Sequence, residues 1–409
     1  MSENVVIEED LLALIKKSLE HEDIENYEVV LTGKTQNGEG YVGDIIFADV
    51  LGTTKDNRKR KVSLAVKRGT SNEHLKKTAP VRKAFETEIH FYSEVVPAFK
   101  TLELEHKIED VFDSVPKCYQ TLLTDSTEAL VFNNLREIGY QMHDRAKPLN
   151  LQHQKKILTE YGKLHALSFA LRDQHPEKFN SLVSDRDVIR DFLSMKHISD
   201  SYQNGIDKAM DMLRENGDFV LENKMRQVFS KHVGEIFSDL FATKETQTAI
   251  LHADGWNNNY LFQYENDDRT SPSKVMILDW QISAVRSPVF DISFLIYITG
   301  SSAEIERFDE LLATYYDSFS SYLRKLGSHP EKLFPFTALE DHWKKYSLYG
   351  LVSAPAALTG ILGGNPASRN GGEDLGITEL LNLNMLEKEK YLFYERISSI
   401  FRHYCKSAL

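Results

Sequence analysis

Cysteine is nearly absent from this 409-residue sequence, which contains only Cys118 and Cys405. Two cysteines cannot supply the disulfide framework of a small secreted protein. The first ten residues, MSENVVIEED, lack a basic segment followed by an apolar core, so no signal peptide is predicted. The glycosylation sequon N-x-S/T is absent as well. These absences predict a protein of a reducing compartment, which we expect to be the cytoplasm.

The sequence also lacks a long apolar run and an excess of basic residues. Its least charged stretch, residues 347–364, contains a proline and four glycines, which favours a buried helix and loop over a membrane span. The formal net charge is −12, which argues against non-specific binding of nucleic acid. An acidic chain still accommodates a nucleotide, because a nucleotide site needs only a few cations and backbone N–H groups. No feature indicates a protein partner.

Strand patterns dominate the first 134 residues. Runs rich in β-branched and aromatic residues cover 42–52, 61–69 and 128–135. A helical pattern at 79–99 interrupts them, and we expect this helix to stop near Pro97. The pattern predicts a small β-rich N-terminal lobe, residues 1–134.

Helical patterns dominate the rest of the chain, residues 135–409. A strand hairpin is predicted within this part, at 249–284. The predicted helices cover 151–171, 194–213, 222–241, 304–326, 339–351 and 386–405. The expected fold class is therefore α+β, with a larger, mainly helical C-terminal lobe.

The stretch GEGYVG places Gly38, Gly40 and Gly43 in the pattern G-x-G-x-x-G. In a dinucleotide-binding fold such glycines open a helix, whereas in a kinase they form a loop between antiparallel strands that covers ATP. A plain hairpin turn is the third interpretation. The strand pattern DIIFADV follows Gly43, which argues against the dinucleotide fold. The motif alone leaves the other two interpretations open.

Two charged residues after this loop favour the kinase. Lys67, in LAVKRG, lies at the end of an apolar strand, as does the lysine that contacts the ATP phosphates in kinases. A solvent-facing lysine is the alternative. Glu88, in FETEIHFY, has apolar neighbours, so we expect it to face inward and pair with Lys67. Glu86, on another face of the helix, is the other candidate.

The most specific motif is LHADGWNNNYLF, in which His252, Asp254 and Asn259 follow H-x-D-x-x-x-x-N. In a kinase, the aspartate accepts the proton of the attacking hydroxyl and the asparagine binds a metal. The next apolar run, VMILDWQ, ends at Asp279, whose carboxylate can complete a Mg²⁺ site beside Asn259. The order of these residues along the chain predicts a kinase, with Asp254 as catalytic base.

These motifs, with GKLHALS and VPKCYQ, resemble the ecdysteroid kinase-like family of insects, also called CHK kinase-like. Its relatives are the choline kinases and aminoglycoside phosphotransferases. The resemblance extends from about Gly33 to the last helix. It implies a bilobal, protein-kinase-like fold and the transfer of a phosphoryl group from ATP, with Mg²⁺, to an alcohol. The roles it implies are the base Asp254, the metal ligands Asn259 and Asp279, and the phosphate contact Lys67 supported by Glu88.

The resemblance implies roles for further residues. Backbone groups near Asn133 and Leu135 would hold the adenine, and the glycines of GEGYVG would cover the phosphates. His165 is read as a packing or hydrogen-bonding residue, and Asp291 as a brace for the catalytic loop.

The sequence departs from the family pattern at three places. Ala253 stands where the family has glycine, which is a small change unless the backbone needs a positive φ. Trp280 replaces the more usual phenylalanine. Asn133-Asn134 replaces a Glu-Asp pair.

Several acceptors and one further class of protein remain open. No A-P-E follows Asp279, and little room is left for an activation loop, so protein kinase activity is disfavoured. The resemblance implies a small-molecule alcohol, an ecdysteroid or another lipophilic or xenobiotic compound. A choline/ethanolamine- or aminoglycoside-type phosphotransferase is the enzymatic alternative. A catalytically inactive, pseudokinase-like binding protein is the alternative of another class.

Overall fold

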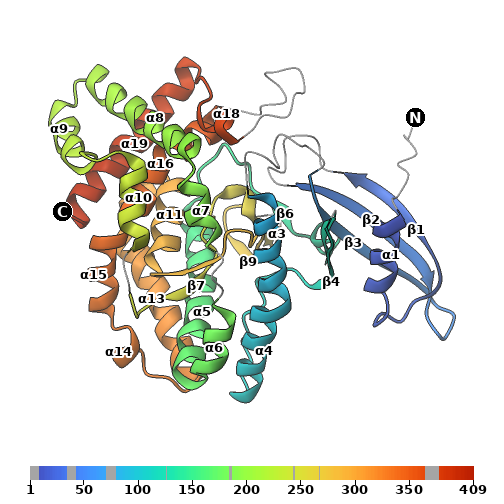
Figure 1. The fold of residues 1–409 in the computed structure, drawn as a ribbon. Helices are drawn as coiled ribbons and strands as arrows, with labels where there is room; N and C mark the ends of the chain where they lie inside the picture. The colour runs from blue at the N-terminus through green and yellow to red at the C-terminus, as the bar shows by residue number, and fades with distance from the viewer. Residues whose placement is uncertain are drawn as a thin grey trace.

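The computed structural model describes residues 9–34, 43–70, 80–125, 127–183, 187–242, 245–266, 268–363 and 377–409. These residues form two lobes, a β-sheet lobe and a larger helical lobe (Figure 1). The predicted α+β class, with a β-rich N-terminal part and a mainly helical C-terminal part, is confirmed. The exact boundary at residues 134/135 stays a prediction. Gly38 and Gly40 lie outside the described residues.

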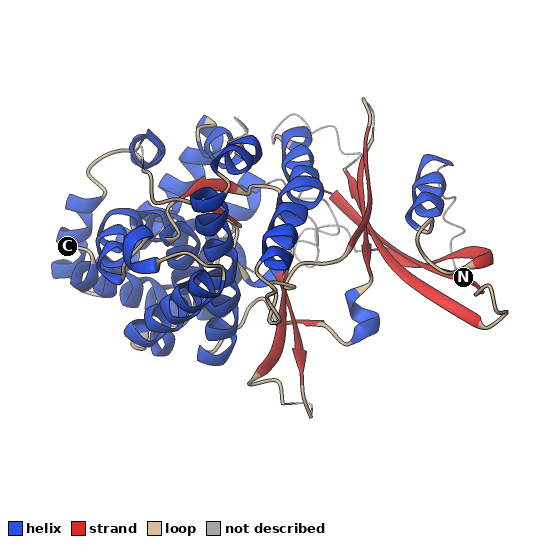
Figure 2. Ribbon diagram, turned by 90° about the horizontal axis from the view of Figure 1, so that it is seen from below, coloured by secondary structure: helices blue, strands red, loops and turns tan. Residues whose placement is uncertain are grey.

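The N-terminal lobe is an antiparallel five-stranded sheet in the order β1-β2-β3-β5-β4. Helix α1 packs on one face of the sheet, and the column α3–α4 lies between the sheet and the helical lobe (Figures 1 and 2). Its elements are α1 (Glu9–Ser18), β1 (Glu25–Lys34), β2 (Gly43–Thr53), β3 (Lys59–Gly69), α3 (Val81–His90), a π-helical turn (Phe91–Val95), α4 (Val96–Glu105), β4 (Cys118–Leu123) and β5 (Glu128–Asn133).

The C-terminal lobe is built around the long helix α5, which packs along α13 and against β7. Its elements are a 3-10 turn (Leu135–Ile138), β6 (Gln141–Met142), α5 (Leu151–Gln174), α6 (Pro176–Leu182), α7 (Val188–Leu193), α8 (Lys196–Glu215), α9 (Phe219–Val228), α10 (Val233–Ala242), β7 (Ala249–Leu251), a 3-10 turn (Asn257–Asn259), β8 (Tyr260–Tyr264), β9 (Pro272–Ile277), β10 (Ala284–Arg286), α11 (Val289–Thr299), α12 (Ser302–Ile305), α13 (Phe308–Lys325), α14 (Pro330–Leu333), α15 (Phe336–Tyr346), α16 (Leu348–Leu362), α18 (Ile377–Leu381) and α19 (Glu387–Ser407).

Two small β elements hold the loop that contains Asp254 and Asn259 in this lobe. Strands β8 and β9 form the predicted hairpin, with Tyr260 opposite Ile277, and β6 adds an edge strand. Strand β7 pairs with β10, with Leu251 opposite Ala284. The segment between β7 and β8 is therefore fixed at both ends, and so is the segment between β9 and β10.

Several predicted helix boundaries were wrong. The helix expected at 304–326 is divided into α12 and α13, and the helix expected at 339–351 runs across the end of α15 and the start of α16. The helix expected to stop near Pro97 continues to Glu105, because a wider π-helical turn comes directly before the proline and relieves the clash its ring makes in an ordinary helix. The helix expected at 222–241 is two helices, α9 and α10. The chain turns between them, and the His232 ring accepts a hydrogen bond from the backbone N–H of Gly234 in the first turn of α10.

The weakly charged stretch forms α16, as predicted, and packs against α8 and α11. Nearly all of its side chains are buried. None of the helices in the described part of the chain combines the length and the apolarity needed to cross a bilayer.

Candidate active site

Lys67 joins the two lobes through a pair of carboxylates. Its Nζ atom lies 2.6 Å from Glu88 Oε2 on α3 and 2.8 Å from Asp279 Oδ1, which follows β9. Strand alternation explains the direction of the side chain. Val66 points to the α1 face of the sheet, so Lys67 points to the opposite face, where α3 lies.

Of the two glutamates considered, the structure brings Glu88 to Lys67. Glu86 pairs with Arg82 instead, at 3.2 Å. The second oxygen of Glu88 accepts the backbone N–H of Trp280 at 3.3 Å. Glu88 therefore contacts both Lys67 and the residue after Asp279, so it ties α3 to the metal-binding segment expected there.

Burial and charge act together on this ion-pair cluster. Burial raises the pKa of Glu88 to about 7, against the opposing charge of Lys67. For Lys67, burial alone would lower the pKa, but the charges of Asp279 and Glu88 outweigh it and raise the pKa. Lys67 is therefore held as a cation.

Asp254 and Asn259 are in contact within the catalytic loop. The Asn259 amide nitrogen donates to the Asp254 carboxylate and to the Asp254 backbone carbonyl, each at 2.9 Å. Burial and the charge of Asp279 raise the pKa of Asp254 to about 7, while hydrogen bonds from Asn259 and the Trp256 side chain oppose the shift. A carboxyl group poised near neutral pH is suited to accept a proton.

Asp291, on α11, holds the backbone of the catalytic loop. Its two carboxylate oxygens accept the N–H groups of His252, at 2.9 Å, and Ala253, at 2.6 Å. His165, on α5, lies 3.2 Å from the same carboxylate. The geometry of both residues agrees with the bracing and hydrogen-bonding roles that the resemblance implied, and all four groups are buried.

Two residues of the site have left-handed backbone conformations. Ala253 has φ 70° and Asp279 has φ 65°. Alanine in place of glycine is therefore not a small change at position 253. The backbone needs a positive φ there, which an alanine adopts only with strain. Aspartate tolerates this region better than most residues.

Sequence reasoning did not assign a role to His252. Its Nε2 atom lies 2.7 Å from the carbonyl of Leu278, so Nε2 carries the proton and links the catalytic loop to the segment before Asp279. Burial lowers the pKa of His252, which keeps the ring neutral. Its Nδ1 lies 3.3 Å from the hydroxyl of Tyr161, one helical turn before His165. The i, i+4 spacing between Tyr161 and His165 is the one sequence signal that could have identified Tyr161.

The structure describes only some of the residues expected to hold the nucleotide base and phosphates. Gly43 starts β2, and a Cβ there would lie 2.2 Å from the Arg68 carbonyl, so close strand packing already requires this glycine. The N–H of Asn133 donates to the Lys117 carbonyl at 3.1 Å, so it is not free for adenine. Leu135 is buried at the start of the turn that follows β5. Their nucleotide roles stay predictions.

The donors near Asp279 fit a hard divalent cation. The described residues contain no cluster of three or more His, Cys, Asp or Glu side chains placed for a metal. However, the Asn259 amide nitrogen is engaged with Asp254, which leaves its oxygen as a ligand beside the partly exposed Asp279. The Asn259 carbonyl accepts the Leu278 N–H at 2.8 Å, which holds the two residues close. Glu88 and Asp279 both pair with Lys67, and Mg²⁺ prefers oxygen ligands such as the Asp279 carboxylate and the Asn259 amide oxygen.

Comparison with known proteins shows a family to which the chain is similar in sequence. The model of the ecdysteroid kinase-like family matches residues 37–328. No curated protein sequence matches the chain. The GDP complex of wild-type aminoglycoside 2'-phosphotransferase-IIIa is similar in structure, with 12% identity over 93% of this chain and 98% of that chain and a TM-score of 0.40. The apoenzyme of a macrolide 2'-phosphotransferase from Brachybacterium faecium gives 14% identity, 93% and 100% coverage and a TM-score of 0.33. Structural similarities at this low identity and TM-score do not indicate what activity this chain has.

Proposed function

The chain belongs to the ecdysteroid kinase-like family, and on this premise we propose that it transfers the γ-phosphoryl group of ATP to a hydroxyl group of a small molecule. The observation that carries the proposal is the position of Lys67 between Glu88 and Asp279. These residues come from different lobes, with 212 positions between Lys67 and Asp279, and meet at 2.8 Å. A structural ion pair needs only one carboxylate, whereas a phosphate-binding lysine beside a metal ligand needs this arrangement.

Asp254 is the proposed base. It would accept the proton of the acceptor hydroxyl while Asn259 holds its carboxylate in place, since the amide donates to Asp254 at 2.9 Å. Asp291 fixes the loop backbone by accepting two of its N–H groups. The Asp254 carboxylate would therefore stay in position beside the reacting oxygen. The described residues thus supply positioning as well as a proton acceptor.

Mg²⁺ is the proposed metal, held by the Asn259 amide oxygen and the Asp279 carboxylate. When bound with ATP, it would offset negative charge on the phosphates. Lys67 would supply a second positive charge to the phosphates, and Glu88 would keep it oriented. Nucleotide use, the metal and a cytoplasmic location are all part of the proposal.

The surroundings of Asp254 favour a lipophilic acceptor. The Tyr349 hydroxyl donates to the carbonyl of Ala253, the residue before Asp254, at 3.3 Å. Burial raises the pKa of Tyr202, and the charge of Asp254 adds to this shift. Phe237 contacts both rings, with centroids 5.4 Å from Tyr202 and 6.3 Å from Tyr349. Aromatic walls suit a steroid-like or xenobiotic ring system. They also suit the ammonium group of choline, which remains the second candidate.

The Asp254→Ala variant tests the proposed base. We expect ATP turnover with a competent acceptor to fall by at least 1,000-fold, while ATP binding stays measurable, because Asp254 contacts the acceptor and not the adenine. Asp268→Ala, in the exposed turn between β8 and β9, removes a carboxylate outside the site and should leave turnover unchanged. Near-normal turnover of Asp254→Ala would overturn the assignment.

A further inference from the structure

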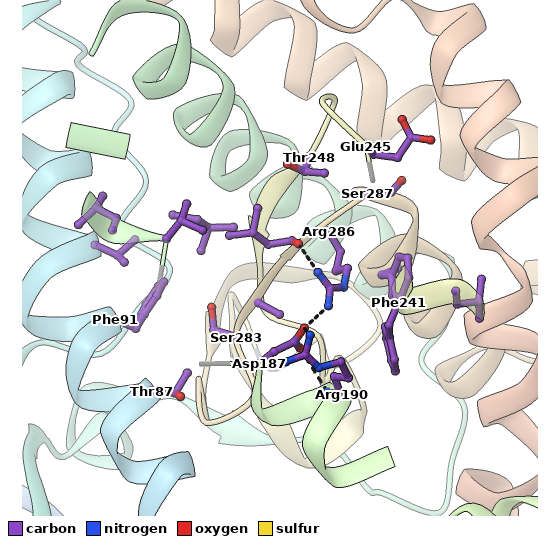
Figure 3. A pocket seen from close by; sticks show the side chains of 18 of the residues that line it. Thr87, Phe91, Asp187, Arg190, Phe241, Glu245, Thr248, Ser283, Arg286 and Ser287 are labelled. Atoms are coloured by element: carbon purple, nitrogen blue, oxygen red, sulfur yellow. Dashed lines mark hydrogen bonds and ion pairs between the residues drawn. The ribbon is translucent and has the colours of Figure 1, made fainter. Parts of the chain in front are cut away.

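A cavity lies beside α3, apart from the residues of the proposed phosphotransfer site. Its volume is about 530 Å³, and its walls come from α3, α7, α10, β10 and the start of α11 (Figure 3). No residue of the proposed phosphotransfer site lines it. The cavity size lies within the range of about 300–1,000 Å³ that is usual for small-molecule sites.

The apolar part of the cavity is aromatic. Phe91, Phe241 and Phe290 line it, and Phe241 lies 6.2 Å from Phe290 between ring centroids. The guanidinium of Arg286 lies over Phe241, 5.4 Å from the ring centroid. The cavity therefore offers a surface for a flat apolar group beside a cation.

The charged part of the cavity has an excess of arginine. Arg286 and Arg190 both pair with the same carboxylate oxygen of Asp187 (Figure 3). The guanidinium nitrogen of Arg190 lies 3.8 Å from that oxygen. The Nε–H of Arg286 is buried and has no hydrogen-bond partner among the described residues. A single carboxylate does not satisfy two guanidinium groups.

The remaining acid of the cavity does not offset this excess. Glu245 lies 2.6 Å from Lys345 and accepts the Tyr346 hydroxyl at 2.6 Å. The hydrogen bond from Lys345 lowers the pKa of Glu245, so the glutamate is ionised and neutralised by its own partner. The arginine end of the cavity is left with net positive charge.

We propose that this cavity binds an amphipathic organic anion, a molecule with a flat apolar body and one carboxylate, sulfate or phosphate group. The aromatic walls take the apolar body. Arg190 and Arg286 bind the anionic group, because a guanidinium fork matches the geometry of such groups.

The cavity wall is mechanically close to the catalytic ion pair. Thr87, His90, Phe91 and Val95 form the wall contributed by the α3 column. Phe91 stacks on Trp280 with ring centroids 3.8 Å apart and planes 6° apart. The backbone N–H of Trp280 in turn contacts Glu88. Occupancy of the cavity therefore changes the affinity of the nucleotide site, and by linkage the nucleotide changes the affinity of the cavity.

The test uses two fluorescent probes of the same shape on the full chain. 8-Anilinonaphthalene-1-sulfonate carries the anionic group, and N-phenyl-1-naphthylamine lacks it. We expect saturable binding of one sulfonate probe per chain that saturating ATP and Mg²⁺ shift but do not abolish. Arg190→Gln should weaken the sulfonate probe by about tenfold and leave the neutral probe unchanged, because only a charge-assisted contact is lost.

Two further variants separate the cavity from surface effects. Val183→Trp places a large ring at the exposed rim and should weaken both probes. Arg402→Gln removes an exposed arginine that pairs with Asp218 elsewhere, and both probes should bind it as they bind the wild type. Equal sulfonate affinity in wild type and Arg190→Gln, or competitive displacement of the probe by ATP, would overturn the proposal whether or not the chain is a phosphotransferase.

Discussion

Asp254 carries a stability cost that its proposed chemistry explains. Burial raises the pKa of its carboxyl group from the ordinary value of 3.8 to about 7. Between these two pH values the folded protein alone holds the proton, so stability falls as pH rises from about 4 to about 7 and is constant above. A residue kept only for packing would have no reason to retain this charge.

We therefore expect Asp254→Asn to stabilise the metal-free protein at pH 8. The expected gain is about 2 kcal/mol, which is smaller than the full linkage value because the site is partly exposed. The gain should shrink as pH falls toward 4, where Asp254 is neutral as well. Urea denaturation of both proteins at pH 4.5 and pH 8 measures it, and a gain independent of pH would contradict the assigned shift.

Ala253 has a strained backbone conformation, and the cost of this strain can be measured. Its φ of 70° suits glycine, so Ala253→Gly should raise the free energy of unfolding by about 1 kcal/mol. Ala249→Gly is the matched control, because Ala249 is buried in β7 and is not among the positive-φ residues. That control should lose about 1 kcal/mol. Urea midpoints of the two variants should move in opposite directions, and a shift in the same direction would show that Ala253 is unstrained.

At the residue scale, the sequence identified the residues that meet in the candidate site better than the residues that hold them in place. Lys67, Glu88, Asp254 and Asp279 stand in motifs whose spacing follows from what phosphoryl transfer requires. His252 is in the same motif, but its link to the Leu278 carbonyl depends on how two separate loops meet. The sequence alone does not show that these two loops come into contact.

The column α3–α4 is the element on which the site depends most. It carries Glu88 on the face toward the sheet and Phe91 on the face toward Trp280. Trp280 is fully buried and donates from Nε1 to the Ile277 carbonyl at 3.1 Å. The stack therefore fixes both the helix and the segment that carries Asp279.

Substitution of Trp280 should separate packing from positioning. Trp280→Ala should cost about 3–5 kcal/mol of stability, whereas Trp280→Phe keeps a ring on Phe91 and should cost about 1–2 kcal/mol. Trp343→Phe is the control, since Trp343 is also buried and hydrogen-bonded, to Ser407, away from the site. Both phenylalanine variants should lose similar stability in urea denaturation, but only Trp280→Phe should weaken ATP binding. Equal ATP affinities would contradict the positioning role.

Element prediction failed where backbone geometry departed from the ordinary pattern. A proline normally ends a helix, and only the π-helical turn before Pro97 lets this one continue. The break between α9 and α10 has no glycine or proline to mark it, and the apolar periodicity continues across it. The strands were predicted well because their β-branched runs are long and bounded by turns.

At the scale of the whole molecule, the α3–α4 column packs into the hydrophobic core of the helical lobe, and ion pairs and one aromatic stack cross between the lobes beside the proposed nucleotide site. Lys67 and Glu88 come from the first lobe, and Asp254, Asn259 and Asp279 from the second. The bilobal α+β organisation was readable from the sequence because strand and helix patterns are separated along the chain. The proposed acceptor side was not readable from the sequence, because the aromatic residues assigned to it come from α8, α10 and α16, which only the tertiary fold brings together.

The central claim is that this chain is an ATP-dependent small-molecule phosphotransferase. The most direct test is ATP consumption with and without Mg²⁺ across panels of steroid alcohols, xenobiotic alcohols and amino-alcohols, with Asp254→Ala in parallel. We expect Mg²⁺-dependent consumption with at least one lipophilic alcohol, the appearance of its phosphate ester, and loss of both in the variant. Metal-dependent ATP binding without phosphorylation of any acceptor would contradict the account and indicate a binding protein.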